Sequence, residues 1–92
     1  MFVTLSEVEA VEMVPGVFRR TLTYGQKAML IHVTLEPGAT VPLHSHPHEQ
    51  LGFVLEGELT MTIGGESRVL KAGDSYLIHP DVEHEARVTR QT

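Results

Sequence analysis

The 92-residue chain contains no cysteine and no tryptophan. Without cysteine, neither a disulfide nor a thiolate metal site can form. The chain also lacks an apolar run of the roughly 20 residues that a membrane helix needs. Its N-terminus has no basic segment followed by an apolar core, which a signal peptide would show. We therefore expect no membrane partner and a cytoplasmic location.

Basic residues are also scarce. Lysine and arginine together number 7 against 12 aspartates and glutamates, which gives a formal net charge of −5 with neutral histidines. Nucleic-acid-binding domains normally present a basic face, so we expect no nucleic-acid partner. The apolar share of 41% and the charged share of 21% are ordinary for a globular protein, and the length predicts one domain over residues 1–92.

Short apolar segments separated by turn residues predict an all-β fold. Ser6–Glu9 has the form of a capping box and predicts a short helical turn before Ala10, and Pro15-Gly16 excludes a longer helix. The expected strands are 17–23, 28–35, 51–55, 58–63, 67–70, 75–78 and 84–89, with a hairpin at Gly64-Gly65. This spacing predicts a sandwich or barrel, and inward metal-binding residues would make it a jelly roll. Residues 51–55 are apolar on both faces, which suits contact with another sheet or a second subunit.

Three of the six histidines lie within the segment Pro42-Leu43-His44-Ser45-His46-Pro47-His48-Glu49-Gln50. Neutral imidazole is a common metal ligand. On a strand, residues two apart share a face with roughly 6.6 Å of rise between them, so His44 and His46 could bind one ion. The alternative is a solvated histidine-rich loop.

The spacing around these histidines resembles a small single-domain cupin of the cupin 2 type. The first motif runs Gly38, five residues, His44, one residue, His46, three residues, Gln50, six residues and Gly57. The second motif is Gly73, ten residues and His84. The chain departs from the family where glutamate is usual at Gln50. It also departs at the positions that usually carry proline, glycine and asparagine, which are here His79, Asp81 and Val88.

The resemblance implies a jelly-roll β-barrel that holds one divalent transition metal through His44, His46, Gln50 and His84. Zn, Ni, Mn, Fe and Cu are not distinguished. Strand parity agrees with this set if one strand runs through Gln50 without a bulge, because His44, His46 and Gln50 then share a face. His84 shares its face with the small apolar residues Ala86 and Val88.

Other polar residues have competing interpretations. His48 has the same parity as His44, but Pro47 favours a rim or surface position for it. Glu49 is expected to be solvated; turned inward, it would create the two-histidine, one-carboxylate site of non-haem Fe(II) oxygenases. His32 is expected to be a hydrogen-bonded structural histidine, and His79 to lie outside the barrel. No catalytic role is assigned to the four residues that could reach a cavity, Arg19, Arg20, Tyr24 and Tyr76.

The segments around His44–Gln50, Phe53–Leu59 and Thr62–Glu66 resemble most closely the pectin-degradation cupins that open unsaturated uronates. That resemblance implies metal-assisted isomerisation of a carboxylated sugar, completed by an aspartate, a phenylalanine and an arginine on a further C-terminal strand. The chain stops before such a strand, so we expect an unpaired sheet edge and leave the catalytic residues unassigned.

Three functions stay open: a uronate isomerase or ring-opening enzyme, a metal-dependent dioxygenase, and a non-catalytic module that binds or senses a small ligand. Because three imidazoles and one amide are neutral, the ion would keep its full charge and favour an anionic or carbonyl-bearing ligand. A homodimer is expected.

Overall fold

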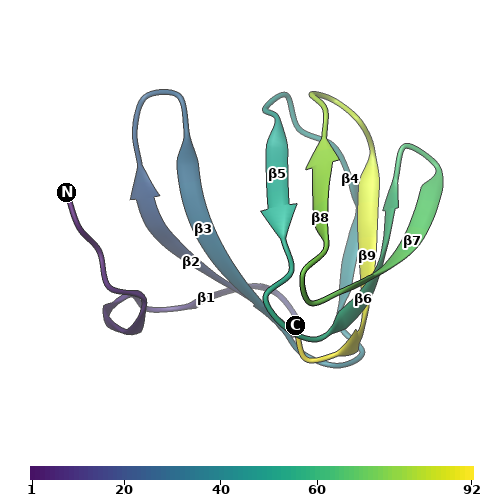
Figure 1. Cartoon of the computed structure of the whole chain (residues 1–92), viewed down its shortest axis with the longest axis horizontal. Helices are drawn as coiled ribbons and strands as arrows, with labels where there is room; N and C mark the ends of the chain where they lie inside the picture. The colour runs from purple at the N-terminus through teal and green to yellow at the C-terminus, as the bar shows by residue number, and fades with distance from the viewer.

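The computed structural model describes residues 1–92 as one short 3₁₀ turn followed by nine β-strands (Figure 1). The turn η1 is Leu5–Glu7. The strands are β1 Val11–Val14, β2 Val17–Tyr24, β3 Met29–Leu35, β4 Thr40–His44, β5 Gln50–Phe53, β6 Glu58–Ile63, β7 Glu66–Lys71, β8 Ser75–Ile78 and β9 His84–Arg90. Nothing helical in the structure has the length and apolar character of a membrane span.

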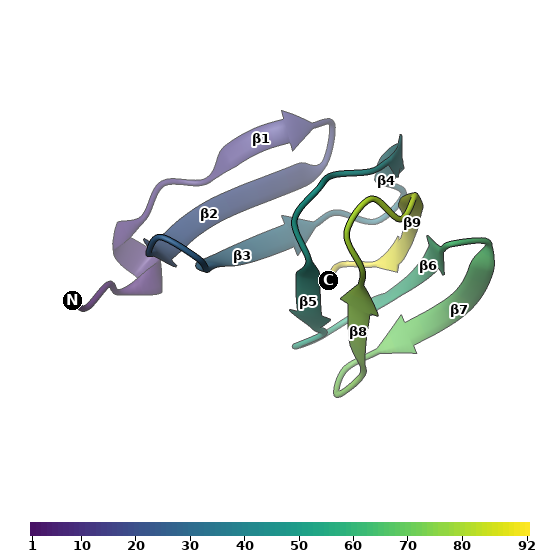
Figure 2. The same cartoon turned by 90° about the horizontal axis from the view of Figure 1, so that it is seen from above.

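Every strand pairing is antiparallel, and the strands form three sheets. One sheet has the order β4-β9-β6-β7, a second the order β1-β2-β3, and a third consists of β5 and β8. In both Figure 1 and Figure 2, β5 and β8 lie between the β2–β3 hairpin and the four-stranded sheet. The predicted all-β jelly-roll fold is confirmed.

The core lies between the sheets because side chains alternate in and out along each strand. On β9, His84, Ala86 and Val88 are buried and the residues between them are more exposed. Leu59 and Met61 repeat this pattern on the neighbouring strand β6. One buried cluster joins the layers and consists of Val17, Leu35, Ala39, Val54, Leu59, Met61, Leu70, Ala86 and Val88.

The β3 and β5 edges that face one another have no strand partner. The only hydrogen-bonded neighbour of β3 within its sheet is β2, and that of β5 is β8. Both strands run in the same direction in Figure 1. Apolar side chains on the two strands are exposed, namely Met29, Leu30, Ile31, Val33, Leu51 and Phe53.

The end of the chain lies beside the base of β3. The Leu35 N–H donates to the Thr92 carbonyl over 2.7 Å, and the Thr92 N–H donates to the Leu35 carbonyl over 2.9 Å. Two residues that exchange both bonds form a hydrogen-bonded antiparallel pair. Thr92 is thus held against the free side of β3.

The predicted short helical turn before Ala10 is present, but its position differs from that of the capping box. The helical turn begins one residue earlier than the capping box, with Thr4 at the N-cap and no side-chain cap bond, so Ser6 lies inside the turn. No helix crosses Pro15-Gly16, as predicted; these residues form the turn between β1 and β2, with Gly16 at φ 80°. Strands β1 and β4 were not predicted.

Candidate metal site

Three histidines and one glutamine from separate elements converge on one site, in which His84 is buried, His46 is partly buried and His44 is exposed. His44 ends β4 and pairs directly with His84, which begins β9. His46 lies in the loop that follows β4, and Gln50 begins β5. One ring nitrogen from each of His44, His46 and His84 lies within 4.8 Å of the others. The Oε1 atom of Gln50 lies 2.9 Å from Nε2 of His46. All four residues expected to bind metal are therefore neighbours.

Backbone carbonyls fix the same tautomer in all three rings. Nδ1 of His44 lies 2.8 Å from the Pro42 carbonyl, Nδ1 of His46 lies 2.9 Å from the His48 carbonyl, and Nδ1 of His84 lies 2.9 Å from the Val82 carbonyl. A carbonyl only accepts, so each Nδ1 carries the hydrogen. In a neutral ring Nε2 then presents its lone pair, which is the state that ligates a metal.

The ring nitrogens and the amide oxygen that face one another in the site are consequently all hydrogen-bond acceptors, and none of them is a donor. Nε2 of His84 is buried and has no hydrogen-bond partner. Nε2 of His46 faces an amide oxygen at 2.9 Å, although both atoms are acceptors while the ring is neutral. A buried polar atom without a partner is costly, and two lone pairs at this distance repel. A cation between these atoms would satisfy all of them, so the donor set fits a divalent metal ion.

Burial favours the neutral form of the His84 ring. Its side chain is one of the eleven buried residues of the chain and the only polar one. Desolvation lowers the pKa of His84 below 6.5, the bond to the Val82 carbonyl opposes this shift, and repulsion from His44 and His46 adds to it. A neutral ring is available to a metal without first losing a proton.

The geometry that brings the four residues together differs from the predicted one. The sequence predicted that His44, His46 and Gln50 share one face of a single continuous strand. In the structure, β4 ends at His44 and β5 starts at Gln50. Residues 45–49 form a loop that contains Pro47, which cannot donate to a ladder. The loop, rather than a shared strand face, turns His46 toward His84, with ring centroids 4.8 Å apart.

The neighbouring polar residues stay outside the cluster. His48 is exposed, as predicted, and stacks on the His46 ring at 3.9 Å with an interplanar angle of 6°. Glu49 is exposed, and its Oε2 lies 4.0 Å from Nδ1 of His79, which is also exposed. A two-histidine, one-carboxylate arrangement is therefore not formed. His32 is partly buried, but its Nδ1 has no partner, so the prediction of a fully hydrogen-bonded ring was wrong.

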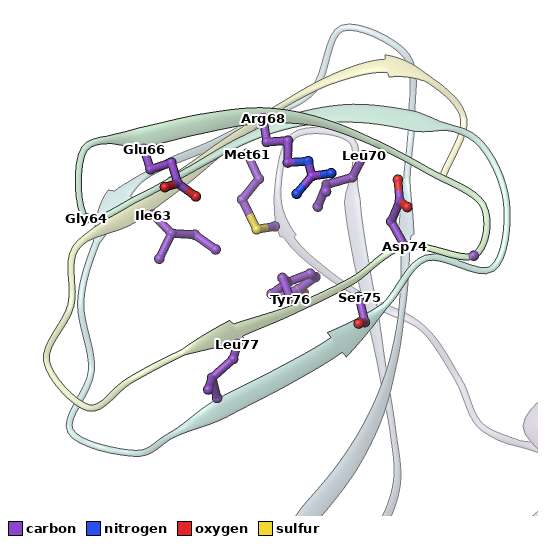
Figure 3. A pocket seen from close by; sticks show the side chains of 11 residues that line it. Met61, Ile63, Gly64, Glu66, Arg68, Leu70, Asp74, Ser75, Tyr76 and Leu77 are labelled. Atoms are coloured by element: carbon purple, nitrogen blue, oxygen red, sulfur yellow. The ribbon is translucent and has the colours of Figure 1, made fainter.

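A cavity of about 600 Å³ lies beside the site, between β6, β7 and β8 (Figure 3). Met61, Leu70 and Tyr76 point into it, as does Arg68 from the inner face of β7. Glu66 and Asp74 also line the cavity, so its formal charge is negative. The cavity charge therefore does not itself favour an anion.

Tyr76 connects this cavity to the histidine cluster. Its hydroxyl lies 3.4 Å from Nε2 of Gln50, whose other amide atom faces His46. Tyr76 was assigned no role from the sequence alone. The available signal was Gly52: a glycine inside an apolar strand often marks close approach of another group.

Residues 31–92 match the protein family described as "Cupin domain". Pectin degradation protein KdgF of Dickeya dadantii (strain 3937) is 34% identical over 67 residues, which are 72% of this chain and 61% of that protein. The HTH-type transcriptional regulator PuuR of Escherichia coli (strain K12) is 41% identical over 56 residues, 60% of this chain and 30% of the regulator. The matches thus span less than two thirds of either relative.

Two solved structures resemble nearly the whole chain. An RmlC-like cupin from Shewanella frigidimarina NCIMB 400 superposes with a TM-score of 0.93 at 30% identity, covering 98% of this chain and 81% of that one. KdgF from Halomonas sp. superposes with a TM-score of 0.92 at 25% identity, covering 98% of this chain and 83% of that one.

Proposed function

Since the chain belongs to the cupin-domain family, we propose that it binds one divalent transition metal and uses it to hold a small anionic or carbonyl-bearing ligand. The proposed ligands of the metal are His44, His46, Gln50 and His84. Zn, Ni, Mn, Fe and Cu all suit imidazole and amide donors.

The main support for this proposal is the convergence of hydrogen-bond acceptors at the site. Three Nε2 lone pairs and one amide oxygen meet without a donor, and one of the nitrogens is buried and unpartnered. A solvated histidine loop, the alternative considered from the sequence, would not need three carbonyls to fix the same tautomer. A structural histidine cluster would be expected to contain donors for its acceptors.

A bound ion would supply Lewis acidity at full charge, because none of its four ligands is charged. The protein's own contribution is to orient the lone pairs and to shield them from water on the His84 side. The ligand would complete the coordination and neutralise the ion, which favours a carboxylate or a carbonyl oxygen.

Metal binding is tested first, with purified protein that has been stripped with a chelator and dialysed. Titration with Zn²⁺, Ni²⁺, Co²⁺, Mn²⁺ and Fe²⁺ should give one site per chain, and a crystal should show one anomalous peak among the four side chains. Failure of every metal to bind would overturn the proposal.

Within this class, we favour an unsaturated uronate as the ligand and its isomerisation or ring opening as the reaction. The support is the resemblance to pectin degradation protein KdgF in sequence and to a KdgF structure in fold. NMR spectra of unsaturated galacturonate should change faster with metal-loaded protein than with the same protein carrying His84→Ala. Equal rates in the two samples would remove the enzymatic assignment and leave metal binding intact.

A non-catalytic ligand-binding or sensing module is the second candidate. It is favoured by the 41% identity to a segment of a protein described as a transcriptional regulator. Under this alternative, unsaturated galacturonate or another carboxylate would bind the metal-loaded protein, as measured by calorimetry, and remain chemically unchanged.

We further propose a homodimer that uses the outer face of β5 and β8. Leu51 and Leu77 are direct cross-strand partners, and with Phe53 they leave an apolar surface exposed. A second copy could cover this surface by the same patch around a twofold axis. A cytoplasmic location also remains a proposal, which cell fractionation would test.

A further inference from the structure

The inner face of β5 contains a glycine where the neighbouring strand places a large ring. Gly52 and Tyr76 are direct partners in the β5–β8 ladder. A Cβ atom added to Gly52 would lie 2.0 Å from Cζ of Tyr76 and 2.4 Å from its hydroxyl oxygen. Such distances are far inside van der Waals contact, so the ring occupies the space that any other residue would fill with its own side chain.

The ring leans along β5 toward the metal site. Gln50 lies two residues before Gly52 and therefore on the same face of the strand. The Tyr76 hydroxyl reaches this diagonal neighbour and lies 3.4 Å from its Nε2. Diagonal contacts of this kind are within reach of aromatic side chains in an antiparallel pair. Without the glycine, the phenol could not take this path.

The contact gives the Gln50 amide a hydrogen-bond partner on the side away from the histidines. When Oε1 faces His46, as in the structure, Nε2–H is left to donate to the Tyr76 oxygen. When the amide is turned over, Nε2–H would donate to the neutral His46 ring and Oε1 would accept from the Tyr76 hydroxyl. A hydroxyl can do either, whereas a phenyl ring can do neither.

We propose that Tyr76, admitted by Gly52, is a positioning residue: its hydroxyl accepts from Nε2–H of Gln50 and so anchors the amide when the amide oxygen faces the metal. This inference rests on the proposed metal site and extends it beyond the four ligands. Partners that orient a ligand from outside the coordination shell typically change metal affinity by about 10–100-fold when they are removed. Tyr76 acts only through Gln50, since no hydrogen bond joins it to a histidine.

The test compares metal dissociation constants, measured by competition with a chelator, for wild type, Tyr76→Phe, Gln50→Ala and the double variant. Tyr76→Phe should weaken binding by about 10–100-fold. In the Gln50→Ala background the same substitution should have no further effect, because there is no amide to orient. Tyr24→Phe is the matched control, since Tyr24 is 68% exposed at the end of β2 and should bind metal as wild type does.

A spectroscopic readout separates positioning from a general loss of fold. The visible absorption of bound Co²⁺ should shift in Tyr76→Phe toward the spectrum of Gln50→Ala, while the circular dichroism spectrum stays unchanged. Gly52→Ala keeps the hydroxyl but displaces the ring, and it should produce the same shift in Co²⁺ absorption.

The outcomes distinguish the two proposals. If wild type binds no metal, the proposed function fails and this inference fails with it. If wild type binds and Tyr76→Phe binds equally well with an unchanged Co²⁺ spectrum, only the positioning role is overturned. An equal loss of affinity in the presence and absence of Gln50 would also overturn it, since Tyr76 would then act by another route.

Discussion

His44 and His84 are direct partners across β4 and β9, and their ring centroids lie 4.1 Å apart although forty positions separate them in the chain. One member of the pair ends its strand and the other begins its strand. The pairing of the two strands therefore determines the spacing of the two imidazoles. Removing either ring should affect the site more than removing a histidine outside the cluster, such as His79.

His84→Ala should weaken divalent-metal binding by more than about 100-fold, beyond the range typical of outer-shell changes. The reason is the loss of the one buried, unpartnered ring nitrogen of the cluster. Calorimetric titration with Zn²⁺ measures the effect. His79→Ala is the control, because that ring is exposed and outside the cluster; equal losses in the two variants would contradict the assignment.

Gln50→Glu should strengthen metal binding by about tenfold, because charge-assisted interactions are markedly stronger than neutral ones. The carboxylate would also lower the net charge of the loaded site, so affinity for an anionic ligand should fall. Both quantities can be measured by calorimetry. Glu49→Gln changes an exposed carboxylate in the adjoining position and should alter neither.

The stability of the metal-free protein should fall as the pH drops below about 6.5. Above that pH, His84 is neutral in both the folded and the unfolded state. Below it, the unfolded chain gains a proton that folded His84 resists, because its folded pKa is lowered, chiefly by burial. The free energy of unfolding then decreases by at most about 1.4 kcal/mol per pH unit until the folded pKa is passed.

Urea unfolding of the metal-free protein between about pH 8 and pH 5 would measure this slope. His84→Leu removes the group and should flatten the profile in that range. A slope that stays the same in the variant would show that another group produces it.

Gly57→Ala should destabilise the fold by about 1–3 kcal/mol. Gly57 has φ 92°, and a Cβ there would lie 2.1 Å from the Gln91 carbonyl oxygen. Gly25→Ala is the matched control, because a Cβ at Gly25 meets nothing within 4 Å. Thermal unfolding should show a clear loss for the first variant and a change within about 0.5 kcal/mol for the second.

Leu51→Lys should shift the proposed dimer toward monomer. Leu51 is 76% exposed on the outer face of β5, and placing a charge at each copy's interface would oppose association. Sedimentation equilibrium measures the dissociation constant. Val69→Lys adds the same charge at a half-exposed position on the four-stranded sheet, and dimerisation should survive it.

Much of the strand pattern could be predicted from local signals. Residues 58–63 and 75–78 form strands with the predicted bounds, because alternating side chains and flanking turn residues agree there. β1 was missed since Pro15-Gly16 was interpreted as an interruption, whereas a hairpin turn uses the same residues. β4 was missed because its residues were considered as possible ligands rather than as a strand.

The candidate site was predictable as a set of residues but not as a geometry. The motif spacing identified His44, His46, Gln50 and His84, yet the loop at residues 45–49 arises from tertiary packing that parity cannot reveal. The tautomer shared by the three histidines could not be predicted either, because it depends on where the backbone carbonyls lie in the folded chain. Tyr76 was missed since its reach to Gln50 depends on a cross-strand partner that has no side chain.

The pair formed by Thr92 and Leu35 sets a register for the free edge of β3. Any extended segment that continues this pairing in antiparallel direction would meet Val33 and then Ile31 at steps of two residues. Because β3 and β5 run the same way, that segment would be antiparallel to both. Its hydrogen-bonding phase on β3 is already determined by the bonds that Thr92 makes with Leu35.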